Sequence, residues 1–287
     1  MPTSVLVLAN LSDTAERAAR YAAALSAPVQ GRLLLLHLFH DPLLDPELVT
    51  VAAAQAYRSR AETTEALREL ARRLPAPTGV LVSVKTIPEA VAEAIQHHQP
   101  QLLAMGLSAE HDALDYLLRN QALPVLRATH HPLLLVPEAA PPPQLPRRVA
   151  VAVDAEPVVL NAAARRLAPL LAAWPATYTV VHATAPGEQQ AFPGQRALGQ
   201  VRASGLLPST THLELYEESH VAPAPGVLQA VDDTQADLLV LMARPRSFLG
   251  SLFHRSITAQ VLRRCRVPVL LLPAEAPELP GWMPLFS

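Results

Sequence analysis

Short, nearly continuous apolar runs alternate along the chain with longer amphipathic segments. Runs of strand length occur at residues 4–9, 32–38 and 80–84, and segments with helical character separate them. Continuous apolar runs of this length are typical of strands covered on both faces of a parallel sheet. The pattern therefore predicts an open α/β sheet with helices on both faces.

One stretch of this pattern occurs twice, at residues 101–137 and 237–273. Each copy has an apolar strand, a short turn, an amphipathic helix (113–128 and about 249–264) and a second apolar strand ending in Pro. A strand–helix–strand unit of this length is a right-handed crossover between parallel strands. The turn after its first strand lies at the carboxyl end of the sheet, where such folds bind ligands.

The rest of the chain also repeats, which indicates a duplication. Landmark residues recur at a nearly constant separation in three pairs: Asn10 with Asp154, His37 with His182, and Pro132 with Pro268. The predicted organisation is one five-stranded domain at 1–137, a stiff Pro-rich linker at 138–147, a second five-stranded domain at 148–273, and a tail without periodicity at 274–287.

Composition narrows the class of protein. Half of the 287 residues are apolar and 17% are charged, which favours a well-buried globular protein over disorder. A net charge of −2 and 4% aromatic residues argue against a nucleic-acid partner. No apolar run approaches the length of a membrane span, and the first residues lack the basic start of a signal peptide, so we expect a cytoplasmic protein without membrane contact.

Three motifs in order carry a resemblance to a known family. A first strand followed by an amide and Ser (VLVLANLSD), a second strand ending in His (LLLLHLF) and a crossover ending in HHPLLLVP resemble the universal stress protein family, in tandem. The resemblance implies two flavodoxin-like domains of strand order 3-2-1-4-5, with a crevice between strands 1 and 4. It also implies that ATP-binding members carry Asp after strand 1 and a Gly-x-x-Gly turn, then Gly with Ser or Thr, after strand 4.

The first half departs from the ATP-binding pattern. Asn10 stands at the Asp position, and the turn keeps Gly106 but has Ala109 at the second glycine. Glu110 and Asp112 add negative charge beside the phosphate position, which would repel a triphosphate. We therefore expect no ATP site of the family kind in this half.

The second half keeps Asp154 but has Ala243 and Arg246 at the glycine positions, with Ser256 at or next to the phosphate-binding pair. ATP or AMP binding here would be weak, and no bound cofactor is expected. Asp154 could accept a hydrogen bond from a ribose or amine of a ligand, or could only cap the next helix.

The turn of the second half also offers an anion site. Arg244 and Arg246, with Ser247 and Ser256, could bind an anion at the start of a helix, or the two arginines could simply be solvated. His37 and His182 recur near the two crevices and are either ligand contacts or hydrogen-bonded structural histidines.

Other candidates for chemistry are weaker. The adjacent pairs His97-His98 and His130-His131 cannot share a helix face, so no metal site is predicted. Cys265, the single cysteine, is expected to be an inert buried thiol. No arrangement of nucleophile, base and acid points to catalysis, so no catalytic residue is assigned.

The sequence leads to three hypotheses for function. The first is a non-enzymatic stress-response protein acting through ligand or protein contacts. The second is a nucleotide-binding protein or slow ATPase that uses the second crevice, and the third is an adenine-cofactor protein similar to an electron-transfer flavoprotein subunit. An unknown protein or a small anion would be the partner in the first case.

The fifth strands, residues 132–136 and 268–272, would each lie at a sheet edge, and an apolar edge invites pairing with another strand. The resemblance implies that family dimers associate through this strand. We therefore predict an internal pseudo-dimer with Leu134, Val136, Val269 and Leu271 near its axis, and leave a homodimer of whole chains open.

Overall fold

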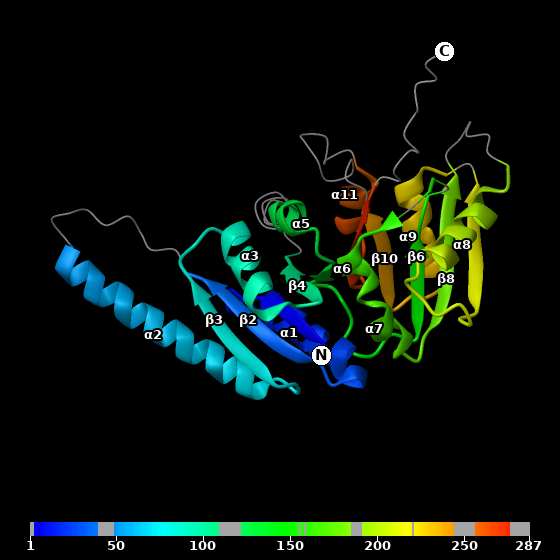
Figure 1. Ribbon diagram of the computed structural model, residues 1–287. Coiled ribbons are helices and arrows are strands. Elements are labelled where there is room, and N and C mark those ends of the chain that lie inside the picture. The colour runs from blue at the N-terminus through cyan, green and yellow to red at the C-terminus, as the bar shows by residue number, and fades with distance from the viewer. Residues whose placement is uncertain are drawn as a thin grey trace, which may run out of the picture.

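The computed structural model describes residues 3–39, 49–108, 122–154, 156–157, 159–184, 191–219, 221–243 and 256–275. Its centre is a single sheet that runs through both halves of the chain (Figure 1). The strands of the first half are β1 (Ser4–Leu8), β2 (Arg32–Leu38), β3 (Thr78–Ser83), β4 (Leu102–Leu107) and β5 (Leu133–Pro137). Those of the second half are β6 (Arg148–Ala152), β7 (Val159–Leu160), β8 (Thr177–Thr184), β9 (Leu213–Ser219), β10 (Leu238–Ala243) and β11 (Val269–Glu275).

The strand order is β3-β2-β1-β4-β5-β11-β10-β6-β8-β9, with β7 added to the end of β11. Within each half the strands are parallel and follow the predicted order 3-2-1-4-5, which confirms the expected fold. The two sheets that the pattern predicted are joined into one.

Helices cover both faces of this sheet, and an apolar core layer lies between the sheet and the helices on each face. One layer lies under α1 (Asp13–Ser26), α2 (Val49–Arg73), α6 (Ala162–Arg165), α7 (Ala168–Ala172) and α8 (Pro193–Ala203). The other lies under α3 (Ile87–His98), α5 (Leu123–Thr129), α9 (Pro223–Asp233) and α11 (Ile257–Leu262). Each layer contains residues of both halves, so the core is continuous across the middle of the molecule.

The two halves meet where β5 pairs with β11, the only antiparallel contact along the described path of ten strands. Leu134 lies opposite Leu270, and both side chains are almost fully buried. On either side of this pair, Leu133 lies opposite Leu271 and Leu135 opposite Val269.

This register places a pseudo-two-fold axis at the central pair. The parallel registers make Leu133 of β5 equivalent to Val269 of β11, and Leu135 equivalent to Leu271. Exchanging the halves therefore converts one flanking pair into the other and leaves the Leu134–Leu270 pair in place, as an isologous contact requires.

Local signals explain where several helices begin. The Ser12 hydroxyl accepts a hydrogen bond from the Ala15 amide at 3.3 Å and caps α1, as expected for a serine just before a helix. Asn161 caps α6 in the same way, accepting from the Ala164 amide at 2.8 Å. The apolar spacing of residues 162–173 predicts a single helix. The structure divides this segment into α6 and α7, with Pro169 in the first turn of α7, because proline has no amide hydrogen to donate inside a helix.

The linker and the tail also differ from expectation. The segment after β5 turns back at once, with the Ala140 amide donating to the Pro137 carbonyl, and packs on α1. Arg17 Nη1 donates to the Ala140 carbonyl at 2.8 Å, and the Tyr21 hydroxyl donates to the Pro141 carbonyl at 2.6 Å. Burial raises the pKa of Tyr21 to about 12, which keeps this donor protonated. At the other end, β11 continues to Glu275 instead of ending at residue 273.

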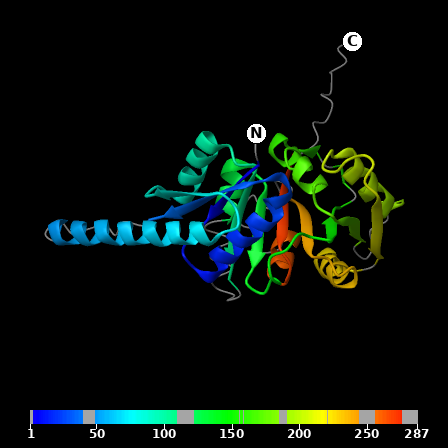
Figure 2. The ribbon, with the colours of Figure 1, turned by 90° about the horizontal axis from the view of Figure 1, so that it is seen from below.

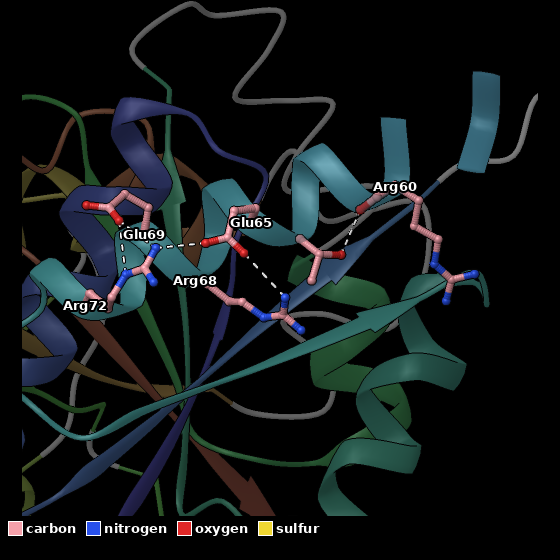
Figure 3. Close-up of polar contacts among 6 residues, drawn as sticks. Arg60, Glu65, Arg68, Glu69 and Arg72 are labelled. Carbon is pink, nitrogen blue, oxygen red and sulfur yellow. Dashed lines mark hydrogen bonds and ion pairs between the residues drawn. The ribbon is translucent and has the colours of Figure 1, made fainter. Parts of the chain in front are cut away.

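Helix α2 extends well past the β3 edge of the sheet in both views (Figures 1 and 2). Its carboxyl-terminal part is held on the core by Leu67 and Leu70. Its exposed face carries ion pairs joining Arg72 Nη2 to Glu65 at 2.8 Å and to Glu69 at 2.7 Å, and Arg68 to Glu65 at 3.4 Å (Figure 3). The hydrogen bonds from Arg72 and then Arg68 lower the pKa of Glu65, but exposed pairs stabilise a fold little, so the leucines hold the helix.

We expect the β5–β11 pairing to hold the halves together in solution. We call the buried pairing of β5 with β11 the seam. Changing Val269 and Leu271 to Asp places two unpaired carboxylates in this seam, which should separate the halves. Small-angle scattering should then give a radius of gyration well above the roughly 19 Å of a compact chain of this length.

The matched control is Leu213→Asp in the outer strand β9, which is also buried but lies far from the seam. Circular dichroism should show helices retained in both proteins. A seam variant that remains folded and keeps the radius of gyration of a compact chain would contradict this prediction.

The buried thiol of Cys265 gives a second prediction. Burial is the main cause that raises its pKa from 9.0 to about 11, and the thiolate is the reactive form. At pH 8 iodoacetamide should modify the native protein on the order of 100-fold more slowly than the urea-unfolded chain, because each pKa unit lowers the thiolate fraction tenfold.

The same shift has a consequence for stability. Because the folded-state pKa lies above the unfolded one, the contribution of Cys265 to stability is complete below about pH 9 and is lost as the pH rises towards 11. For the alkylation experiment, the contradicting result is a native protein that iodoacetamide modifies at pH 8 as fast as it modifies the unfolded chain, because the thiol would then not be buried.

Candidate functional site

The candidate site of the first half lies at the carboxyl ends of β1 and β4, where the order of the strands reverses. A cavity of about 150 Å³ opens there. Its walls come from the strand ends, the first turn of α1 and the start of α3, and its lining is Leu8, Ala9, Asn10, Thr14, Ala15, Leu36, Leu38, Ile87, Met105 and Gly106. The sequence thus places Asn10 and Gly106 together as expected, in mainly apolar surroundings.

The side chain of Asn10 is engaged within its own loop. Its Oδ1 accepts hydrogen bonds from the Ser12 amide at 3.2 Å and from the Ser12 hydroxyl at 2.5 Å. The same hydroxyl caps α1 through the Ala15 amide. Asn10 therefore fixes the turn between β1 and α1, and its amide oxygen is already satisfied.

Gly106 is required by the packing of α1 on β4. A Cβ at this position would lie 2.2 Å from the Thr14 carbonyl oxygen and 2.4 Å from its carbonyl carbon. The backbone of the first turn of α1 thus occupies the space that a side chain would need. Close helix–strand contact is a sufficient reason for glycine here, without any contribution from a phosphate.

His37 and His182 hold equivalent positions in the two halves. His37 Nδ1 lies 2.7 Å from the Ala9 carbonyl, and His182 Nδ1 lies 3.1 Å from the Val153 carbonyl. Since a carbonyl only accepts, Nδ1 carries the proton in both rings and each histidine ties the second strand to the end of the first. His182 Nε2 is buried and has no hydrogen-bond partner among the described residues. Contacts of this kind are those that a hydrogen-bonded structural histidine makes.

In the second half, Asp154 lies at the end of the first strand, where Oδ1 accepts from the Glu156 amide at 3.2 Å. Ser256 caps α11, accepting from the Ala259 amide at 3.1 Å, and its hydroxyl can still donate. Ala243 is the last residue of β10. Ala109, Arg244, Arg246 and Ser247 lie outside the described residues, so the proposed anion site around them stays a prediction.

The strand registers correct one assignment from the sequence. Gly106 pairs with Val136 in the first half, and in the second half Met242, not Ala243, holds the equivalent pairing with Leu272. Ala243 corresponds to Leu107. The position of the first glycine is therefore taken by a methionine in the second half, whose side chain packs against the core layer under α1 and α8.

The described residues meet neither the requirements of a metal site nor those of a membrane-spanning helix. In these ranges no three His, Cys, Asp or Glu side chains gather in a way that could hold a metal ion. None of the helices described combines the length and hydropathy needed to cross a bilayer.

The sequence interpretation missed a second cavity, of about 340 Å³, between the two halves. Its lining comes from the ends of β4 and β5 and from the end of α11: Leu107, Ser108, Pro137, Glu138, Ala139, Leu262, Arg263, Arg264, Cys265 and Arg266. The only signal in the sequence is the run of arginines just before the fifth strand of the second half.

Comparison with solved structures supports this fold. A universal stress protein from Archaeoglobus fulgidus DSM 4304 is similar over 96% of this chain and 97% of its own, with a TM-score of 0.63 and 16% identity. A putative universal stress protein from Pseudomonas aeruginosa UCBPP-PA14 covers 94% of this chain and 93% of its own, with a TM-score of 0.52 and 17% identity. At these identities the likeness shows the fold alone.

Sequence comparison identifies the family. No curated protein sequence matches the chain significantly. The model of the universal stress protein family matches residues 1–137 and again residues 146–273, so each half carries its own match. With this match and the strand order of both halves in agreement, the chain belongs to the universal stress protein family.

Proposed function

We propose that this chain is a non-enzymatic stress-response protein that acts through ligand or protein contacts, with a first crevice that does not take a triphosphate. One observation carries the proposal: the two described residues of that crevice that correspond to nucleotide-binding positions are engaged in the fold itself. Asn10 orders the turn before α1, and Gly106 accommodates the backbone of Thr14.

The size and polarity of the first crevice support the same proposal. Its volume of about 150 Å³ is below the range of roughly 300–1,000 Å³ typical of small-molecule pockets. An amide at position 10 offers no charge to a ligand, and the described lining residues include no pair of groups suited to acid–base chemistry.

The second candidate function is nucleotide binding in the other crevice. Asp154 keeps the acidic position, and the Ser256 hydroxyl retains a proton to donate. The third candidate is an adenine-cofactor protein, a class that includes proteins built on the same kind of parallel sheet. Native mass spectrometry of the chain purified without nucleotide separates the three, because it would show no adduct, an ATP or AMP adduct, or a flavin.

We expect the first crevice to bind ATP no more tightly than about 1 mM, roughly −4 kcal/mol. Calorimetric titration of ATP into the full chain tests this, with Asp154→Asn as the companion variant. Micromolar binding that is lost in Asp154→Asn would place the nucleotide in the second crevice. Micromolar binding that persists in this variant would contradict the proposal for the first.

A further inference from the structure

The pseudo-two-fold axis at the Leu134–Leu270 pair generates two related grooves between the halves. Because β5 and β11 are antiparallel, the carboxyl end of each fifth strand lies beside the end of the last helix of the other half. One groove lies between the end of β11 and the end of α5. The other lies between the end of β5 and the end of α11.

The first of these grooves is filled by the chain itself. Strand β7 pairs antiparallel with the end of β11, Leu160 with Ala274 and Val159 with Glu275. Asn161 follows, with its amide donating to the Pro273 carbonyl at 3.4 Å and its Nδ2 donating to the His130 carbonyl at 2.7 Å, at the end of α5.

The segment that fills this groove has no counterpart in the other half. In the first half the helix cap Ser12 follows Asn10 by two positions, whereas in the second half the cap Asn161 comes seven positions after Asp154. The loop of the first half is therefore too short to supply a strand like β7. Its groove is the cavity of about 340 Å³ between the halves, which lies within the usual size range of small-molecule sites.

The end of α11 beside the open groove carries more arginines than the equivalent end of α5 beside the filled one. Arg264 and Arg266 precede Pro268 by four and two positions, as Ala128 and His130 precede Pro132 in the other half. Both arginines line the open groove and are exposed, and their guanidinium groups make no hydrogen bond or ion pair with any described residue. Arg263 adds a third positive charge, and Glu138 is the one carboxylate among the described residues of the lining.

We propose that the open groove binds a small anion that carries a phosphoryl group, held by Arg264 and Arg266 against the ends of β4 and β5. Two guanidinium groups match the geometry and charge of a phosphate dianion and can each donate two hydrogen bonds to its oxygens. This site is distinct from both crevices and does not depend on the function proposed for them. Since its walls belong to both halves, the bound anion contacts both and stabilises their pairing.

The test uses the full chain, with inorganic phosphate and glycerol 3-phosphate as probes and sodium chloride of equal ionic strength as the blank. Thermal unfolding should show a phosphate-dependent rise in Tm, and calorimetry gives Kd. Arg264→Ala with Arg266→Ala should raise Kd at least tenfold. Equal affinity for both probes would assign recognition to the phosphoryl group alone, and tighter binding of glycerol 3-phosphate would assign an organic phosphate as the ligand.

The matched control is Arg165→Ala with Arg166→Ala, which removes the same charge from two exposed arginines outside the cavity lining. It should change Kd less than twofold. Glu138→Gln should tighten binding, because a carboxylate leaves the lining. If the alanine pair does not fold, Arg264→Lys with Arg266→Lys keeps the charge but loses the two-pronged hydrogen bonds and should still weaken binding severalfold.

Three results would overturn the proposal. One is the absence of any phosphate effect beyond that of chloride. Another is an equal loss of affinity in the Arg165 and Arg166 control, which would indicate diffuse attraction by net charge. The third is binding that survives in the Arg264 and Arg266 variant but disappears in Arg244→Ala with Arg246→Ala, which would place the anion in the turn of the second half.

Discussion

The pairing of β5 with β11 is the contact on which the rest of the molecule depends. It turns two five-stranded sheets into one, joins the core layers on both faces, and sets the axis at Leu134 and Leu270. An apolar fifth strand left at an open edge would attract other chains. Here each fifth strand covers the other, and the free edges of the described sheet are β3 and the acidic β9.

Most of the fold could be predicted because its strands are continuous apolar runs, which only a sheet covered on both faces buries well. The failures have local causes. Pro169 divides a segment whose apolar spacing predicts one helix. Strand β7 has two residues, with Val159 exposed, so it carries no periodicity to detect. The Pro-rich linker has the composition of a free spacer, and its contacts with Arg17 and Tyr21 depend on backbone carbonyls that any sequence has.

The candidate sites were only partly predictable for a related reason. Sequence motifs locate residues near one another along the chain, and Asn10 and Gly106 were correctly placed beside one cavity. The motifs could not show that Thr14 occupies the space beside Gly106, nor that Met242 holds the equivalent register in the second half. The groove between the halves needs Ser108 and Arg264 together, and only the antiparallel seam brings them near.

Strand β7 has a consequence for the evolution of such chains. In a dimer of two identical subunits, any inserted segment would appear twice and would close both grooves at once. A fused chain escapes this constraint, because an insertion in one copy changes a single side of the axis. The five extra positions between Asp154 and Asn161 close one groove and leave its twin accessible, so duplication with fusion allowed this molecule to become asymmetric while keeping a symmetric seam.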